Sequence, residues 1–476
     1  MTRATGFLLG WAALATALLA PLLWVEAHGF LSGAVIADWG RAILQVDGPA
    51  LFRATDPLYP PLPKVLTLAV QGVAGRPGLP TPHIVSLAVG GLTLLVWFGE
   101  FRRRGRYSAP VAAALVLLLA LNPVFLRALS EGPGAVFLVL GTWLYARSLL
   151  DLRQSGTAPD MMKVAIGLLV VSMAHPFGLL IAMGSLPVIV LAARPSMIAA
   201  SSLGFMVSMF FPAAAAVASL LFVSLVLGST FLALEPTPAG LAPLDELSLP
   251  LLTGAMAVIV LARLVPAPRR MLPLLAAMAG LLGAILLNFV FRFESDPALL
   301  AAPMLGLLAA ALPLSPVNRV RGAAMTAFLL LALPLNGWGL ATFGAELDRR
   351  WLEAALGHDL GDPLRRERAL AAFLRDREGV LLDAERHPGL IAVLGGTRGL
   401  VIAGQTSYEL AALGGRPRAG YIAVRAPEGS TGGRDRLLAA QPQLSISAPG
   451  GYRLAYQSGP WRVFEITGGN RTWDGT

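Results

Sequence analysis

Two carboxylates, Asp38 and Glu131, are the residues of this chain best placed to do chemistry, because each lies in a short polar segment beside a long apolar run. Arg41 follows Asp38 at a spacing that lets the two side chains pair on one helical face. If both carboxylates face one cavity, they can activate a hydroxyl group as a general base or hold a divalent cation such as Mg2+ or Mn2+. The simpler alternatives are a solvated loop aspartate for Asp38 and a helix cap for Glu131.

A second group of residues has the chemistry to bind an anionic substrate. Arg292 and Glu294 form a polar cluster at the end of an apolar run, where arginine can bind phosphate through paired hydrogen bonds. An ordinary membrane-interface anchor is the alternative for this cluster. His175 precedes a proline within the apolar region, where a histidine is costly without a partner. Tyr59 and Lys64 belong to the Pro-rich run YPPLPK that follows the first aspartates, and they are further candidates for substrate binding.

Several signatures of soluble enzymes are absent from the sequence. It contains no phosphate-binding Walker loop, no Asp-x-Asp pair and no histidine spacing typical of zinc. The glycine-rich stretch 395–399 lacks the spacing of a nucleotide-binding loop, and the chain has no cysteine. A soluble nucleotide-sugar donor therefore has no visible binding site, and a donor presented from the lipid bilayer fits better.

The composition is that of an integral membrane protein. Of the 476 residues, 55% are hydrophobic and only 14% are charged. About eleven apolar runs approach the length that crosses a bilayer. The first run, residues 7–25, is longer than a usual signal-peptide core, so we expect it to be retained. Arginines gather in alternate short loops, and the positive-inside rule then places the N-terminus in the cytoplasm. We attribute the net charge of +9 to this topology and not to a surface for nucleic acid.

The chain is expected to divide into two domains. Residues 1–342 form a transmembrane domain, and residues 26–82 within it form a first outer loop. The stretch 60–73 in that loop is expected to be a helix on the membrane surface. In residues 343–476, charged helical stretches alternate with short apolar strands, which indicates a small α/β domain. An odd number of spans places this domain on the outer side of the membrane, which would be the periplasm if the membrane is a bacterial inner membrane.

These features resemble the GT-C superfamily of polytopic membrane glycosyltransferases. The matching positions are Asp38 in the first outer loop, the Pro-rich run at 60–63, the stretch from Asn122 to Glu131, and the region from Arg292 to Pro303. The C-terminal domain is similar to the tail domain of some bacterial members. The chain departs from the commonest pattern at Trp39, because many members carry a second acidic residue there.

The resemblance implies inverting transfer of a hexose or pentose from a polyprenyl-phosphate-linked sugar to a lipid, glycan or protein acceptor. By this resemblance, Asp38 of this chain would deprotonate or orient the acceptor hydroxyl, and Arg292 would stabilise the departing lipid phosphate. Glu131 would position the acceptor or share a divalent cation with Asp38. The remaining candidates for substrate binding are Arg41, Tyr59, Lys64, His175 and Glu294.

Two other classes of protein stay open. One is a transporter or flippase for a lipid or sugar, for which a helix broken at His175 and its following proline would be the supporting feature. The other is a non-catalytic assembly factor for cell-envelope glycans, which would keep the fold without the activity.

Overall fold

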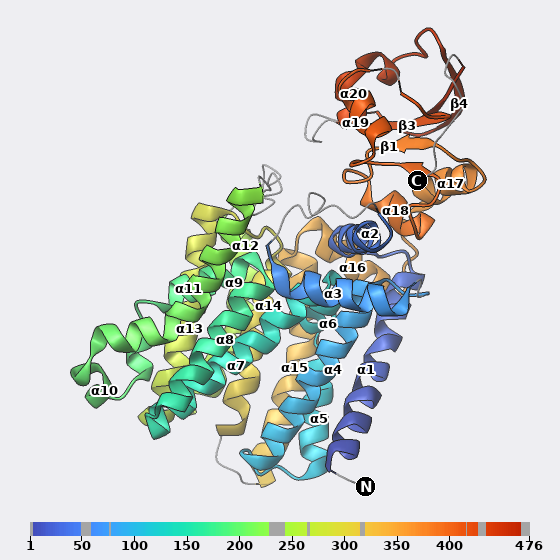
Figure 1. Ribbon diagram of the computed structural model, residues 1–476. Coiled ribbons are helices and arrows are strands. Elements are labelled where there is room, and N and C mark those ends of the chain that lie inside the picture. Colours follow the sequence, from blue (N-terminus) through green and yellow to red (C-terminus); the bar gives the residue numbers. More distant parts are fainter. Residues whose placement is uncertain are drawn as a thin grey trace. The chain divides into compact units, whose positions relative to one another are not determined.

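A computed structural model describes residues 3–48, 59–75, 78–227, 243–263, 267–314, 319–415, 417–426 and 435–467. Packing divides the chain into two compact units. The helical unit comprises residues 1–32, 57–63 and 82–361, and the sheet unit comprises residues 33–56, 64–81 and 362–476. Figure 1 shows the long helices of the helical unit and the small sheet with its covering helices in the sheet unit.

The helical unit is built from long apolar helices rich in leucine and alanine, which favour helix strongly. Its α-helices are α1 (Arg3–Ala27), α4 (Thr81–Arg103), α5 (Ala109–Ala120), α6 (Pro123–Glu131), α7 (Pro133–Ser155), α8 (Ala158–Ala174), α9 (Pro176–Ser185), α10 (Pro195–Ala200), α11 (Ser202–Leu227), α12 (Pro243–Ala262), α13 (Pro268–Phe291), α14 (Pro297–Ala311), α15 (Arg319–Phe343) and α16 (Glu346–Ala355). Two short 3-10 helices join them, η2 (Ile189–Ala192) and η3 (Leu312–Leu314). Helix α3 (Pro61–Ala74) begins in this unit and continues in the sheet unit.

Seven helices within the described residues are long and apolar enough to cross a membrane, and the number rises to eight if the bent pair α5 and α6 is one span. The pair is bent by 59°. Pro123 has no backbone N–H to continue the helical pattern, and the Asn122 side chain caps α6 by accepting from Val124 N at 3.0 Å. The chain is therefore a multi-pass membrane protein, as its composition predicts, whereas the number eleven stays a prediction.

Helix α14 is the innermost helix of this unit, because every residue from Pro297 to Ala311 is buried. It packs closely on α7 at Gly306. A Cβ atom at this position would lie only 2.4 Å from the carbonyl oxygen of Val139, so only glycine allows the two backbones to approach so closely. This contact fixes the position of α14 along the axis of its neighbour α7. It thereby also fixes the position of Asp296, the residue that precedes α14.

The sheet unit contains one five-stranded sheet with the order β2-β1-β3-β5-β4. Strands β1, β2 and β3 are mutually parallel, β5 runs antiparallel to β3, and β4 and β5 form a hairpin. The strands are β1 (Val380–Leu382), β2 (Leu400–Val401), β3 (Tyr421–Arg425), β4 (Tyr452–Ser458) and β5 (Trp461–Ile466). The helices of this part are α17 (Arg365–Leu374), α18 (Pro388–Leu394), α19 (Thr406–Ala412), α20 (Arg436–Ala440) and the 3-10 helix η4 (Pro442–Ser445).

Helix α2 (Gly33–Asp47) packs with this sheet although it comes early in the chain. Ile43 and Leu44 of α2 join one hydrophobic core with residues of α17, α18 and the sheet. Gly40 lies against α18, where a Cβ atom would be 2.0 Å from the carbonyl oxygen of Pro388. Residues of α2 that lie near Gly40, Asp38 among them, are therefore positioned by the sheet unit.

Candidate active site

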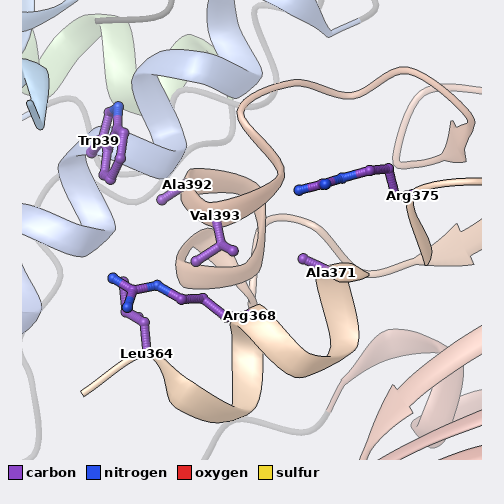
Figure 2. Close-up of a pocket in the computed structure, with 7 residues that line it drawn as sticks. All are labelled: Trp39, Leu364, Arg368, Ala371, Arg375, Ala392 and Val393. Atoms are coloured by element: carbon purple, nitrogen blue, oxygen red, sulfur yellow. The ribbon is translucent and has the colours of Figure 1, made fainter. Parts of the chain in front are cut away.

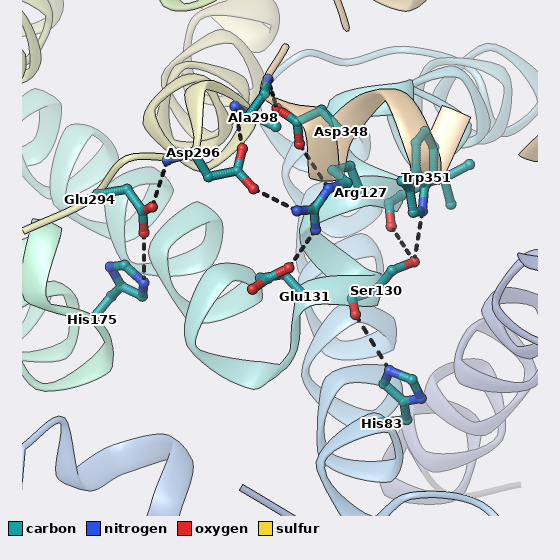
Figure 3. A network of polar contacts seen from close by, with 12 residues as sticks. His83, Arg127, Ser130, Glu131, His175, Glu294, Asp296, Ala298, Asp348 and Trp351 are labelled. Carbon is teal, nitrogen blue, oxygen red and sulfur yellow. Dashed lines mark hydrogen bonds and ion pairs between the residues drawn. The ribbon is translucent and has the colours of Figure 1, made fainter. Parts of the chain in front are cut away.

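A buried arginine surrounded by carboxylates lies in the helical unit (Figure 3). The side chain of Arg127, on α6, is completely buried. Its Nη1 donates to Glu131 Oε2 at 2.6 Å, its Nη2 to Asp296 Oδ2 at 2.5 Å, and its Nε to Asp348 Oδ1 at 2.8 Å. A guanidinium group has five N–H donors in a fixed plane, so one arginine can hold three carboxylates in a set arrangement.

Each carboxylate is placed by the start of a helix or by a helical turn. Glu131 follows Arg127 by four residues, which puts the two side chains on one face of α6. Asp296 caps α14, where its Oδ1 accepts from Ala298 N at 2.8 Å. Asp348 lies in the first turn of α16 and accepts from Ala345 N at 3.1 Å. The cluster therefore links three helices that are far apart in the sequence.

Two further contacts connect this cluster to neighbouring helices. The Trp351 indole N–H, on α16, donates to the Ser130 hydroxyl of α6 at 3.0 Å. His83 of α4 lies with its Nε2 atom 3.4 Å from the Ser130 carbonyl oxygen of α6, and its Nδ1 lies 2.5 Å from Glu26 Oε1 of α1. The position of α6 is thus fixed from several sides.

Glu294 and His175 form a pair beside the arginine cluster (Figure 3). The Nε2 atom of His175 lies 3.3 Å from Glu294 Oε2. Its Nδ1 accepts from Phe177 N at the start of α9, so the ring proton is on Nε2 and points to Glu294. Burial, together with the negative charge of Asp296, raises the pKa of Glu294 to about 8. Glu294 is therefore mostly protonated at neutral pH.

The segment 292–296 that carries Glu294 is held tightly. Asn288 Nδ2 donates to the Glu294 carbonyl at 2.7 Å, and Asn288 Oδ1 accepts from Glu294 N at 3.0 Å. The Glu294 carboxylate accepts from the backbone N–H groups of Ser295 and Asp296, each at 2.8 Å. Arg292 ends α13 in the left-handed conformation, with φ 52°, which is uncommon for residues other than glycine. Its guanidinium lies 5.9 Å from the Phe289 ring centroid.

The structure brings together several residues that the sequence analysis had singled out. Glu131, His175 and Glu294 share one polar region with Arg127. Tyr59 also reaches this region, because its buried hydroxyl donates to the backbone carbonyls of Ser172 and His175 at the break between α8 and α9.

Asp38 lies elsewhere, on α2 of the sheet unit. Its side chain is 27% exposed and pairs with Arg41 at 3.6 Å, as their spacing predicts. Burial raises the pKa of the Asp38 carboxyl, and the positive charges of Arg41 and Lys64 counteract part of this rise. Because Asp38 and Glu131 belong to different units, their expected meeting in one cavity stays a prediction.

Three members of the cluster were missed by the sequence reasoning: Arg127, Asp296 and Asp348. The signal for Arg127 was an arginine inside an otherwise apolar helix, four residues before a glutamate. Asp296 precedes a proline, which is a common way to start a helix. Asp348 gave no comparable signal, because charged residues are ordinary after residue 343.

The predicted Mg2+ or Mn2+ stays a prediction. Among the described residues, no group of three or more His, Asp or Glu side chains is arranged to hold a metal. In the cluster around Arg127 the guanidinium already takes the place between the carboxylates that a cation would need. These residues do not fit a metal, and we derive no step through one.

The fold is similar to that of a solved structure over nearly the whole chain. This structure, one of several that match, is the crystal structure of ArnT from Cupriavidus metallidurans in the apo state, and it matches with a TM-score of 0.55. The match covers 97% of this chain and 98% of that chain at 15% sequence identity. No family model matches the sequence, and no curated protein matches it either. The likeness thus extends over the full length of both chains and concerns the fold.

Proposed function

We propose that the chain is a glycosyltransferase that moves a sugar from a polyprenyl-phosphate-linked donor to an acceptor at the outer face of a bacterial inner membrane. The observation that carries this proposal is the full-length agreement in fold with ArnT. The multi-pass architecture also favours a donor that reaches its site from the bilayer. The acceptor is a lipid, a glycan or a protein side chain.

The transfer is a single displacement. The acceptor oxygen attacks the anomeric carbon, while the bond from that carbon to the donor phosphate oxygen breaks and its electron pair leaves with the polyprenyl phosphate. The acceptor proton passes to the carboxylate of Asp38, which acts as general base. Burial raises the pKa of Asp38 above its usual value, which makes the carboxylate a stronger base, and the pairing with Arg41 limits this rise. One displacement inverts the configuration at the anomeric carbon.

The helical unit supplies the groups that bind the substrates. Arg292, at the end of α13, stabilises the charge on the departing phosphate. Glu131 positions the acceptor, and Arg127 fixes its orientation through their 2.6 Å hydrogen bond. The raised pKa of Glu294 lowers the negative charge next to a site that must accept a phosphate. Tyr59 fixes the backbone around His175, and Lys64 adds a positive charge near Asp38.

The test uses the full chain in lipid nanodiscs with polyprenyl phosphates that carry a radiolabelled hexose or pentose, and with cell-envelope lipid and glycan fractions as acceptors. We expect free polyprenyl phosphate to appear together with label in an acceptor. Asp38→Asn should strongly slow the formation of both products. Asp47→Asn changes an exposed aspartate of the same helix and should slow neither.

A transporter or flippase is the second candidate, because one helix pair within the described residues is bent at a proline. The bend lies between α5 and α6, and broken helices are typical of transporter binding sites. In proteoliposomes, movement of the intact labelled donor without release of polyprenyl phosphate would favour this candidate. A donor that neither moves nor reacts would favour the non-catalytic assembly factor.

A further inference from the structure

Two adjoining pockets lie on the sheet unit and are not needed for the transfer just described. The larger has a volume of about 860 Å3 and the smaller about 340 Å3, and they share lining residues of α17 and α18. The larger pocket extends to the amino ends of β1, β2 and β3. Its lining residues there are Arg377, Glu378, Arg398, Gly399, Leu400 and Tyr421.

Three arginines line the larger pocket. Arg377 is held in place, because it donates to the Phe373 carbonyl and its guanidinium lies over the Phe373 ring, 3.6 Å from the centroid. Arg375 and Arg398 are exposed, and neither side chain forms an ion pair or hydrogen bond within the described part of the chain. Two arginines with free donors next to a fixed one are suited to paired hydrogen bonds with a carboxylate or phosphate.

Other lining groups suit a sugar. Trp39 of α2 lies across the smaller pocket from α17 and α18 (Figure 2). Tyr421 lines the larger pocket. Aromatic rings offer flat apolar faces on which the C–H face of a sugar ring can pack. The exposed carboxylates of Asp376 and Glu378 can accept hydrogen bonds from sugar hydroxyls, and they leave the larger pocket with one excess positive charge.

The position of the larger pocket argues against a nucleotide. Open α/β sheets bind nucleotides at the carboxyl ends of their parallel strands, whereas this pocket lies at the amino ends. The nearby glycine-rich stretch 395–399 also lacks the fingerprint of a phosphate-binding loop.

We propose that the two pockets together form a binding site for an anionic saccharide, one that carries carboxylate or phosphate groups. Arg375, Arg377 and Arg398 bind the anionic group, and Trp39 and Tyr421 contact the sugar rings. This binding does not depend on the transfer reaction. The smaller pocket includes the residue next to Asp38, so the bound saccharide lies on the helix that carries the proposed base.

The test measures binding to the full chain in detergent by titration calorimetry. The probes are trigalacturonate, the neutral trisaccharide maltotriose and inorganic phosphate. We expect trigalacturonate to bind at least tenfold more tightly than either of the others. The double variant Arg375→Ala/Arg398→Ala should lose at least tenfold in affinity, because each lost charge-assisted contact is worth about a factor of ten.

Two control variants test whether the loss of affinity is specific to the arginines that line the pocket. Arg453→Ala removes an arginine that is 73% exposed and pairs with Glu465 on β5, away from the pocket lining, and it should bind trigalacturonate normally. Arg375→Lys/Arg398→Lys keeps the charge but loses the paired donors, and it should bind at an intermediate level. Equal binding of both saccharides, phosphate binding as tight as trigalacturonate, or full binding by the double alanine variant would overturn the proposal. Binding only to vesicles that contain phosphatidylglycerol would overturn it too, in favour of a membrane contact.

Discussion

Arg127 Nη1 lies 2.6 Å from Glu131 Oε2, one turn further along α6, and the two residues differ in their exposure. The arginine side chain is fully buried, whereas the glutamate side chain is 14% exposed. The arginine also holds Asp296 and Asp348, which are less exposed than Glu131. Within this cluster Glu131 is therefore the carboxylate most open to a ligand, and Arg127 is a positioning residue.

Removing the arginine should destabilise the helical unit strongly. In Arg127→Met three carboxylates lose their common partner, and loss of one partner from a buried ion pair costs about 3 to 5 kcal/mol. Thermal unfolding in detergent should show a clearly lower melting temperature. Arg453→Ala breaks an exposed ion pair of the sheet unit and should hardly change it. Equal melting temperatures for the two variants would show that the cluster does not stabilise the fold.

The proposed base should be distinguishable from its neighbour on the same helix. Asp38→Asn should lower the rate of transfer by about 100-fold to 10,000-fold, the range typical for loss of a general base, with little effect on the melting temperature. Asp47→Asn should keep the rate, because this exposed aspartate contributes only its backbone carbonyl, to Thr397. An Asp38→Asn protein with normal transfer would exclude the role of this carboxylate.

Glu294 should make the stability depend on pH. Its pKa is about 8 in the folded protein and 4.5 without burial, so between these values the folded state binds more protons than the unfolded state. The free energy of unfolding should therefore fall as pH rises from about 5 to 8, and the stabilisation is lost above the folded pKa. Melting temperatures between pH 5 and pH 9 test this. Glu294→Gln mimics the protonated acid and should show a flatter profile; parallel profiles would contradict the assignment.

The packing of α2 on the sheet unit can be tested without touching a carboxylate. Gly40→Ala places a methyl group 2.0 Å from the Pro388 carbonyl oxygen, so α2 must move away from α18. We expect lower stability of the sheet unit and loss of transfer, because Asp38 moves with the helix. Gly33→Ala, at the start of the same helix, meets no atom within 4 Å and should be tolerated. Limited proteolysis and the transfer assay would measure both effects.

The hydroxyl of Tyr59 should contribute to the stability of the break between α8 and α9. Tyr59→Phe leaves the carbonyls of Ser172 and His175 without this donor, which should cost about 1 to 3 kcal/mol. The melting temperature is the measurement. Tyr452→Phe removes a hydrogen bond to Gln441 that is only partly buried, and the loss should be smaller. A Tyr59→Phe protein as stable as the wild type would show that the two carbonyls find other donors.

Local patterns in the sequence predicted the membrane character, the Asp38–Arg41 pair and several members of the polar region. These features depend on composition or on residues a few positions apart. The cluster around Arg127 could not be predicted in the same way, because Asp348 is 221 residues further along the chain. The packing of α14 and α16 decides which distant carboxylate approaches the arginine. Neither helix has a sequence pattern that predicts which helices it packs against.

The placement of α2 has a similar explanation. Its position after the first apolar run predicts an outer loop, and the helical spacing of Asp38 and Arg41 predicts that these two side chains can pair. Ile43 and Leu44 pack into the core of a sheet formed near the C-terminus. This contact depends on the shape of that core and not on a local pattern. A glycine in the middle of a helix, at Gly40, was the one local sign of a close neighbour.

The same long-range contact has a consequence for how the chain is made. During synthesis Arg127 enters the membrane long before Asp296 and Asp348 exist. Glu131 follows it by only four residues, so the two can insert as a neutral pair. The later aspartates each bring a negative charge that has no other partner among the described ion pairs than this arginine. Each of these ion pairs can form only when its helix has packed in the correct position. Helix α16 is synthesised last of the three, so its ion pair completes the assembly of the helical unit.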